Sequence, residues 1–388
     1  MLNPYLEKTL YSQPAQPVLV EIDPARVNEV IGQITGLKVP LLDRIPTFSM
    51  AAFAPVTPET IRAINALPGV RLVHANLQVR AFQEPPAPAD WWPTSQSRQA
   101  LEAERAFIEG FTGEAVRVGV PDTGVDVSHP QLEGTEFYST ISWPVRETLD
   151  SEGHGSHVNS TIAGKLYNTP VGIIVEGVSR AQLVSVKCLG RGIGTGFTSE
   201  IINAMSVCYD KGCRVVSMSL GSDDGEPQGG PENDPFWRII RSLTARGVIF
   251  VIAAGNSGPD PDTIGNPGSC PEAITVAAID ARGQPASFSS RGGPKFPTKP
   301  DVCAPGVKIY SGTSHLSPMA IEQPQAGYGF VAISGTSMAC PHVAGLVALL
   351  KHKYPSMTAQ QFKDVMMVKG KKFDNITGWG IPRWSMFS

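Results

Sequence analysis

Short apolar segments alternating with helix-like segments fill the chain from about Ala100 onward, and this pattern limits the fold more than any other feature. Apolar runs of five or six residues are typical of strands buried on both faces, and intervening helices favour parallel pairing. The expected strands are Val116–Val120, Leu183–Lys187, Val215–Ser219, Val248–Ala253 and Ile274–Ala278, and the expected helices include Thr198–Tyr209 and Phe236–Arg246. The sequence therefore predicts an α/β fold with a doubly wound, mostly parallel sheet, whose functional residues gather at the carboxyl ends of strands.

Residues 17–82 show a different pattern, that of a small α+β unit. Strands are expected at Val18–Ile22, Phe48–Phe53 and Val70–His74, with one helix at Pro24–Ile34 and a second that begins at Pro58 after an N-cap at Thr57. Two β-α-β halves of this length resemble a ferredoxin-like sandwich. The stretch 83–93 that follows is rich in proline, which indicates a linker.

Composition excludes some classes of partner. The chain has 388 residues and a net charge of −3, so neither a nucleic acid nor an anionic membrane surface is expected. No apolar run reaches the length of a membrane span. The N-terminal segment lacks the basic and apolar regions of a secretory signal, so the localisation stays open between an intracellular protein and a secreted one without its signal.

Six cysteines are spread over the chain from Cys188 onward, too few to be a disulfide framework. Cys208 and Cys213 are near enough in sequence to bond, although two free buried thiols are the favoured alternative. No histidine or second cysteine pair accompanies them at the spacing of a zinc site.

Three segments carry residues suited to acyl transfer. Asp122 ends the apolar strand in Val-Gly-Val-Pro-Asp-Thr-Gly, His154 lies in Gly-His-Gly-Ser-His, and Ser337 lies in Gly-Thr-Ser-Met-Ala at the start of a long apolar helix. A serine nucleophile needs an imidazole to take its proton and a carboxylate to fix the imidazole tautomer. Asn256, just past another strand, adds a side-chain amide of the kind that stabilises an oxyanion.

In the order Asp, His, Asn, Ser, these segments resemble the signatures of the subtilisin-like serine proteases, the subtilases, over roughly 92–382. The chain order Asp, His, Ser differs from the orders of chymotrypsin-like and α/β-hydrolase enzymes. The resemblance implies a subtilisin-like serine endopeptidase. It assigns Asp122 as the orienting carboxylate, His154 as general base and then acid, Ser337 as nucleophile, and Asn256 with the Ser337 N–H as the oxyanion hole.

The resemblance also implies a cleft that binds an extended polypeptide substrate between two chain edges. One edge would be formed by Gly194, Thr195 and Gly196, and the other by Ser219, Leu220 and Gly221. The S1 pocket would be walled by Ser219–Gly221, Ala253, Ala254, Gly255 and Gly265. None of these residues is charged, so large apolar or aromatic P1 side chains are the expected preference.

Residues 17–82 resemble the inhibitory propeptides of this family, whose last residues lie in the active site as the first substrate. The implied division is a propeptide at 1–82, a proline-rich linker or mature N-terminus at 83–99, and a catalytic domain at 100–388. Autocleavage is expected between Phe82 and Gln83, with an aromatic residue in an apolar S1 pocket, or else within the proline-rich linker.

The chain departs from the family pattern in two places that bear on function. Pro121 stands directly before Asp122, where it removes a backbone donor from a central strand and puts the local geometry in doubt. Gln131 and the loop 169–176 lack the carboxylates with which many subtilases bind calcium, so the usual high-affinity site is not expected. No cofactor is otherwise indicated; for calcium elsewhere, the acidic segment 223–226 is the one cluster of interest, and a solvated loop is the favoured interpretation.

Two histidines and a cysteine in the motifs fit structural roles better: His157, His342 and Cys340 would pack the site rather than act in it. Two other functions stay open from sequence. One is a catalytically silent binding protein on the same fold, and the other is a peptide ligase or macrocyclase in which an amine resolves the acyl-enzyme.

Overall fold

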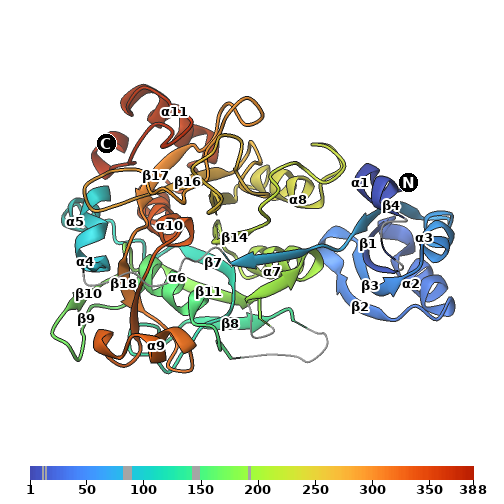
Figure 1. The fold of residues 1–388 in the computed structure, drawn as a ribbon, viewed down its shortest axis with the longest axis horizontal. Coiled ribbons are helices and arrows are strands. Elements are labelled where there is room, and N and C mark those ends of the chain that lie inside the picture. Colours follow the sequence, from blue (N-terminus) through green and yellow to red (C-terminus); the bar gives the residue numbers. More distant parts are fainter. Residues whose placement is uncertain (11–12, 14, 82–89, 142–148, 191–193) are drawn as a thin grey trace.

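The computed structural model describes residues 1–10, 13, 15–81, 90–141, 149–190 and 194–388. Figure 1 shows a small N-terminal unit beside a larger unit that contains the remainder of the described chain. Among the described residues, no helix is long and apolar enough to cross a membrane.

The larger unit is built on a seven-stranded sheet in the order β17-β16-β15-β13-β7-β11-β8. All six pairs of neighbouring strands in this sheet are parallel. The strands are β7 (Arg117–Asp122), β8 (Glu136–Ser139), β11 (Gln182–Lys187), β13 (Val215–Met218), β15 (Ile249–Ala253), β16 (Ile274–Ile279) and β17 (Val302–Pro305). The predicted doubly wound parallel sheet is confirmed, and β8 and β17 extend it at its two edges.

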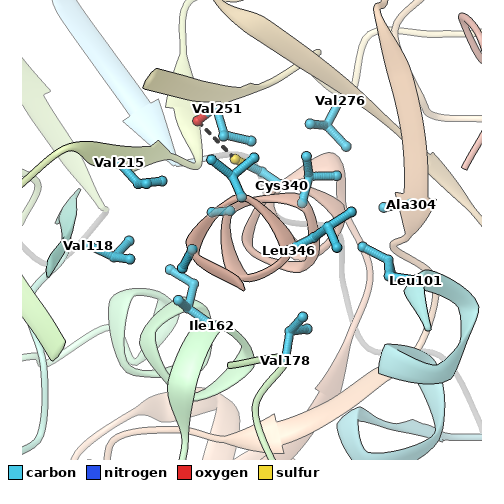
Figure 2. Packing of buried hydrophobic residues seen from close by; sticks show 14 of the residues in the cluster. Leu101, Val118, Ile162, Val178, Val215, Val251, Val276, Ala304, Cys340 and Leu346 are labelled. Carbon is cyan, nitrogen blue, oxygen red and sulfur yellow. Dashed lines mark hydrogen bonds between the residues drawn. The ribbon is translucent and has the colours of Figure 1, made fainter. Parts of the chain in front are cut away.

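Helices cover both faces of the sheet, because alternate strand residues point in opposite directions. Val251 packs in the cluster of α6 (His154–Ala163) and α10 (Thr336–Lys353), whereas Ile252 packs in the cluster of α7 (Thr198–Asp210) and α8 (Pro235–Thr244). Figure 2 shows α10 ringed by strand residues on one side and by residues such as Ile162 on the other. This burial holds α10 against the sheet, and the first residues of α10 carry the predicted nucleophile.

Smaller elements surround this core. They are β6 (Trp92–Pro93), α4 (Thr94–Ser97), η3 (Arg98–Leu101), α5 (Ala103–Ile108), β9 (Tyr167–Asn168), β10 (Ile174–Val175), β18 (Ile309–Gly312), α9 (Pro318–Glu322), η4 (Pro324–Ala326), β19 (Phe330–Ile333), α11 (Ala359–Lys369) and η5 (Trp384–Phe387). β6 pairs parallel with β18, so the last two residues of the predicted linker belong to a strand.

The N-terminal unit has four strands in the order β2-β3-β1-β4, all antiparallel where paired. Its elements are α1 (Pro4–Thr9), β1 (Gln16–Ile22), η1 (Pro24–Arg26), α2 (Val27–Gly36), β2 (Leu41–Ile45), η2 (Pro46–Phe48), β3 (Met50–Val56), α3 (Pro58–Asn65) and β4 (Val70–Ala75). From β1 onward this is the β-α-β-β-α-β arrangement of a ferredoxin-like sandwich. Thr57 accepts a hydrogen bond from the Thr60 amide, as an N-cap of α3 does.

One further strand connects the two units. β5 (Gln78–Ala81) leaves the N-terminal unit and lies between β12 (Thr195–Phe197) and β14 (Leu220–Gly221) in a three-stranded antiparallel sheet. In Figure 1 it is the blue strand that extends toward β14. The residues that follow it, including Phe82 and Gln83, lie outside the described part of the chain.

Pro121 does not interrupt β7, which continues to Asp122 and pairs with β11 at Pro121 and Val186. The Asp122 carbonyl accepts from the amides of Cys188 and Leu189, which follow β11. Because neighbouring residues of a strand direct their backbone groups to opposite sides, the backbone groups of Pro121 face β13. The pairing of β13 with β7 ends at Gly119. The missing donor therefore lies past the end of that ladder, and the expected disturbance near Asp122 is absent.

All six cysteines are free and buried, including Cys208 and Cys213. The favoured alternative of two free thiols therefore agrees with the structure.

Candidate active site

Asp122 and His154 come together at the carboxyl end of the sheet. Asp122 is the last residue of β7, and His154 is the first residue of α6. Their side chains are buried, and His154 Nδ1 lies 2.7 Å from Asp122 Oδ1. Since a carboxylate oxygen only accepts, Nδ1 carries the proton and Nε2 is the basic nitrogen. The pair is thus a preoriented imidazole of defined tautomer.

A buried carboxylate that the sequence analysis missed, Asp150, holds the start of α6 in place. One oxygen of Asp150 accepts from the Gly153 amide and the Thr123 hydroxyl, both at 2.9 Å. The other accepts from the amide and hydroxyl of Ser156, at 2.9 and 2.5 Å. Asp150 therefore joins the residue after Asp122 to the helix turn that carries His154. Asp150 lies three residues before the N-cap of α6, Gly153, so it does not stand at the position of an ordinary cap signal, and the local sequence does not reveal the bond to Thr123.

Ser337 lies in the first turn of α10, at the end of a helix where backbone N–H groups favour negative charge. Its Oγ donates to the carbonyl of Ser219 at 3.0 Å, and the Ser219 hydroxyl donates to the carbonyl of Ser337 at 2.9 Å. This reciprocal pair joins the end of β13 to the start of α10. The predicted nucleophile and a predicted S1 residue are therefore in direct contact.

Asn256 follows β15 and is held by Thr336, a residue that the sequence analysis did not single out. The backbone N–H and the hydroxyl of Thr336 approach Asn256 Oδ1 at 3.0 and 2.9 Å. Because a backbone N–H only donates, the contacted atom is the carbonyl oxygen, and the amide NH₂ points elsewhere. This buried Nδ2 has no hydrogen-bond partner among the described residues. The arrangement presents a preoriented donor beside the first turn of α10.

Five of the six predicted residues of the cleft edges contact β5, and the sixth, Ser219, directly precedes one of these edges. On one edge the pairs are Thr195 with Arg80 and Gly196 with Val79, and the Gly194 carbonyl accepts from the Ala81 amide at 3.2 Å. On the other edge the pairs are Leu220 with Ala81 and Gly221 with Arg80, and Ser219 precedes this strand. A side chain at Gly196 would place its Cβ 2.0 Å from the Cys188 carbonyl oxygen, so glycine is required there.

The other predicted S1 residues also lie close together. Ala253 ends β15, the Ala254 carbonyl accepts from the Gly265 amide at 2.8 Å, and the Gly255 amide donates to the Thr336 hydroxyl at 3.1 Å. Gly255 has a φ of +107°, a conformation that favours glycine. The segment 253–255 is thereby fixed between Gly265 and the start of α10.

The remaining polar residues of the motifs have partners of their own. His157 and His342 are buried, and burial lowers their pKa to about 3 and about 4. His157 Nε2 donates to the Ile309 carbonyl, and His342 Nδ1 donates to the Met338 carbonyl. Cys340 Sγ donates to the Val251 carbonyl, as Figure 2 shows, and burial raises the pKa of its thiol to about 12. A thiol with that pKa is a poor nucleophile at neutral pH.

Gln131 and the acidic segment 223–226, the two places that bear on calcium, both have partners within the protein. Gln131 accepts from the Ser160 hydroxyl at 2.8 Å and donates to the Lys165 carbonyl at 2.9 Å, so both ends of its side chain are engaged. In the segment 223–226, Asp223 and Glu226 pair with Arg80 and Lys295. Among the described residues, no group of three or more His, Cys, Asp or Glu side chains gathers as a metal site does.

A family model and several known proteins match this chain, and they agree on the family. The model of the "Subtilase family" matches residues 113–380. Serine protease AprX of Bacillus subtilis (strain 168) is 32% identical over 338 residues, which cover 81% of this chain and 72% of that protein. Subtilisin amylosacchariticus of Bacillus subtilis subsp. amylosacchariticus is 36% identical over 267 residues, which cover 68% of this chain and 62% of that protein.

A solved structure supports the fold. The crystal structure of fervidolysin from Fervidobacterium pennivorans, "a keratinolytic enzyme related to subtilisin", matches with a TM-score of 0.75 and 24% identity. The match covers 96% of this chain and 60% of that one, so this chain spans less than two thirds of fervidolysin. The family model and the relatives above cover most of the larger unit. The chain belongs to the subtilase family and is a serine-type endopeptidase.

Proposed function

We propose that Ser337 is the nucleophile of this endopeptidase, with His154 as its general base and Asp122 as the orienting carboxylate. The Nδ1–H of His154 donates to Asp122, which leaves Nε2 to take the proton of the Ser337 hydroxyl as Oγ attacks the peptide carbonyl. The imidazolium then gives this proton to the leaving amine, and water hydrolyses the acyl-enzyme with His154 as base again. The bond between Ser337 Oγ and the Ser219 carbonyl must break when the hydroxyl turns toward the imidazole.

Asn256 is proposed to stabilise the oxyanion together with the backbone N–H of Ser337. The observation in support is its unpaired, buried Nδ2, whose direction is fixed by the two bonds from Thr336. An unsatisfied buried donor costs free energy in the resting protein, and an oxyanion would satisfy it.

Residues 1–82 are proposed to act as an intramolecular inhibitor that is removed by autocleavage between Phe82 and Gln83. The observation that carries this proposal is β5, which pairs with both edges of the cleft as an extended substrate would. Ala81 lies opposite Leu220, so a substrate in this register has its next residue opposite Ser219, which contacts the nucleophile. That next residue is P1, and position 82 is a phenylalanine.

The contact between the two units supports a specific inhibitory complex. Leu19, Ile45 and Met50 of the N-terminal unit share one apolar cluster with Met205 and Trp237 of the larger unit. In addition, Asn76 donates to the Ser199 hydroxyl and accepts from the Ser199 amide, both at 2.8 Å. Such a cluster, with polar groups in reciprocal contact, is typical of a stable interface.

A preference for large apolar or aromatic P1 side chains is proposed from the S1 residues. Ser219–Gly221, Ala253–Gly255 and Gly265 carry no charge. A charged P1 side chain would therefore lose its hydration there without gaining an ion pair from these residues.

The test compares the full-length wild type with Ser337→Ala and with Ser334→Ala as a matched control, using intact mass and N-terminal sequencing after incubation. We expect the wild type and Ser334→Ala to lose residues 1–82, and Ser337→Ala to stay intact. A new N-terminus within residues 84–93 would move the cleavage site to the linker. An intact wild type that also fails to react with a serine-directed phosphonate would contradict the proposal and favour a silent binding protein.

Hydrolysis and ligation are separated with a peptide substrate of the sequence that surrounds position 82. Hydrolysis adds the mass of one water to the sum of the products, whereas ligation or cyclisation does not. Products without added water would favour the peptide ligase.

A further inference from the structure

Arg80 and Asp223 form an ion pair across the cleft edge. Arg80 lies in β5 opposite Gly221, and its Nη2 is 2.6 Å from Asp223 Oδ2. In the register described above, Ala81 occupies P2 and Arg80 therefore occupies P3. The partner of the P3 side chain is thus a residue of the larger unit, two positions beyond the strand that binds the substrate backbone.

The carboxylate of Asp223 has a second partner, which belongs to the larger unit and not to β5. Its other oxygen accepts from the Ser257 hydroxyl at 3.1 Å, and Ser257 follows the proposed oxyanion donor Asn256. The backbone pairing of β5 with β14 likewise fixes the position from which the Arg80 side chain extends. Other contacts thus hold the Asp223 carboxylate and the backbone at Arg80, so formation of the ion pair costs little additional conformational entropy.

The neighbouring charges do not compete for this role. Glu226 pairs with Lys295 at 3.2 Å, and Asp224 accepts from the Glu226 amide at 3.0 Å to close the turn. Asp223 is thus the acidic residue of this loop whose ion pair is with β5. Both side chains are about half exposed, so the contact is strong enough to select among substrates and weak enough to be screened by salt.

We propose that Asp223 determines specificity at subsite S3 and makes the protease favour substrates with a basic residue, arginine above all, at P3. This inference rests on the proposed function, because it takes β5 as a model of the bound substrate. It assigns the acidic segment 223–226, which sequence analysis considered for calcium, a role in substrate selection.

The test uses processed enzyme and three quenched peptides, Gln-Val-Xaa-Ala-Phe-Gln-Glu, with Arg, Gln or Glu at the P3 position. For wild type at low salt, kcat/KM should be about two- to fivefold higher for Arg than for Gln, and lower for Glu than for Gln. Asp223→Asn should bring the three values together, and Asp223→Lys should reverse their order. The control Asp224→Asn should leave the wild-type order in place. High salt should compress the wild-type differences.

Equal kcat/KM for the three peptides in wild type, or an order that Asp223→Lys leaves unchanged, would overturn the proposal. Damage to the loop would lower kcat/KM for all three peptides together, and the order of the three values could still be determined.

The contact between Arg80 and Asp223 is also tested without hydrolysis, through hydrogen exchange of residues 78–81 in full-length Ser337→Ala. Arg80→Gln and Asp223→Asn should each speed this exchange about two- to fivefold, and the double variant should be no faster than either. Additive effects would overturn the pairing, even if no peptide were hydrolysed and the proposed function failed.

Discussion

Thr336 donates both its backbone N–H and its hydroxyl to Asn256 Oδ1, at 3.0 and 2.9 Å. One residue of the nucleophile segment thereby fixes the amide of a residue 80 positions earlier. The backbone bond survives any substitution of the Thr336 side chain, whereas the hydroxyl bond does not. Substitution of Thr336 therefore tests how the Asn256 amide is oriented, whereas substitution of Asn256 tests whether the amide is needed.

We expect Asn256→Leu to lower the rate of autocleavage about 10²- to 10³-fold, because one of the two oxyanion donors is lost. Thr336→Val should lower it much less, about tenfold, because the backbone N–H still holds the amide. The measurement is the first-order loss of full-length chain by intact mass. Equal losses in the two variants would mean that Asn256 acts through the structure of its loop and not as a donor.

Asp150→Asn should lower kcat about tenfold with little change in KM, because it loosens the turn that positions His154. Two of the four donors to Asp150 would then face an NH₂ group in a buried site. The hydroxyl of the two can turn to accept from it, but the backbone N–H cannot, at a cost of about 1–3 kcal/mol in the free energy of unfolding. The control is Asp126→Asn, since the Asp126 carboxylate contacts Ser128 and His315 and not the start of α6. A change in KM alone would contradict the positioning role.

Buried histidines make the folded protein sensitive to acid. Burial lowers the pKa of His342 to about 4, below the 6.5 of an unfolded chain, so its contribution to stability is present above pH 6.5 and is lost as pH falls toward 4. For full-length Ser337→Ala, this one group should remove about 2 kcal/mol from the free energy of unfolding between pH 7 and pH 5. Denaturant titrations should show that His342→Gln removes this part of the pH dependence.

Asp43 gives a contribution of the opposite sign. Burial raises its pKa to about 6, so its contribution to stability is present below pH 3.8 and is lost as pH rises through 6. The contribution of Asp43 is the same in Ser337→Ala with and without His342→Gln. It therefore cancels when the pH profile of one protein is subtracted from that of the other. A difference profile without slope between pH 7 and pH 5 would show that His342 takes up a proton in the folded state.

Strands that are buried on both faces were predicted best from the sequence. Each of the five expected strands of the large sheet matches its observed counterpart within two residues, because a continuous apolar run leaves little choice of structure. β2, β8 and β17 were missed. β17 (Val302–Pro305) is buried, but it has only four residues and ends in a proline, so its sequence gives little indication of a strand. β2 contains Asp43 and Arg44, and β8 begins at the exposed Glu136; both lie at a sheet edge, where a polar strand resembles a loop in sequence.

For the site, the sequence pointed to residues with a chemical signature and missed those that act through geometry. Asp122, His154, Asn256 and Ser337 stand in recognisable segments. Asp150 and Thr336 matter through bonds to groups that only the fold brings near. The pairing of Arg80 with Asp223 spans 143 positions, so nothing in either local segment predicts it.

Asn3 should set how long the N-terminal unit stays bound after cleavage. Its buried Nδ2 donates to the carbonyls of Gln228 and Asn233 in the larger unit, at 3.0 and 2.8 Å. Asn3→Ala would leave these acceptors without that donor, at a cost of about 1–3 kcal/mol, so dissociation should be about 10- to 100-fold faster. The measurement is the delay between autocleavage, followed by intact mass, and the appearance of peptide hydrolysis.

The matched control is Asn28→Ala, an exposed asparagine of the same unit whose side chain contacts Arg44. Because the hydrogen bond of the Asn28 side chain is to Arg44 of its own unit, the Asn28→Ala variant should keep the delay of the wild type. Glu21→Gln offers a second route to the same result, since Glu21 pairs with Arg238 of α8 at 2.6 Å and also contacts the buried His74. If Asn3→Ala kept the wild-type delay while Glu21→Gln shortened it, the interface would depend on the ion pair and not on Asn3. If neither variant changed the delay, cleavage itself and not release of the N-terminal unit would limit the appearance of activity.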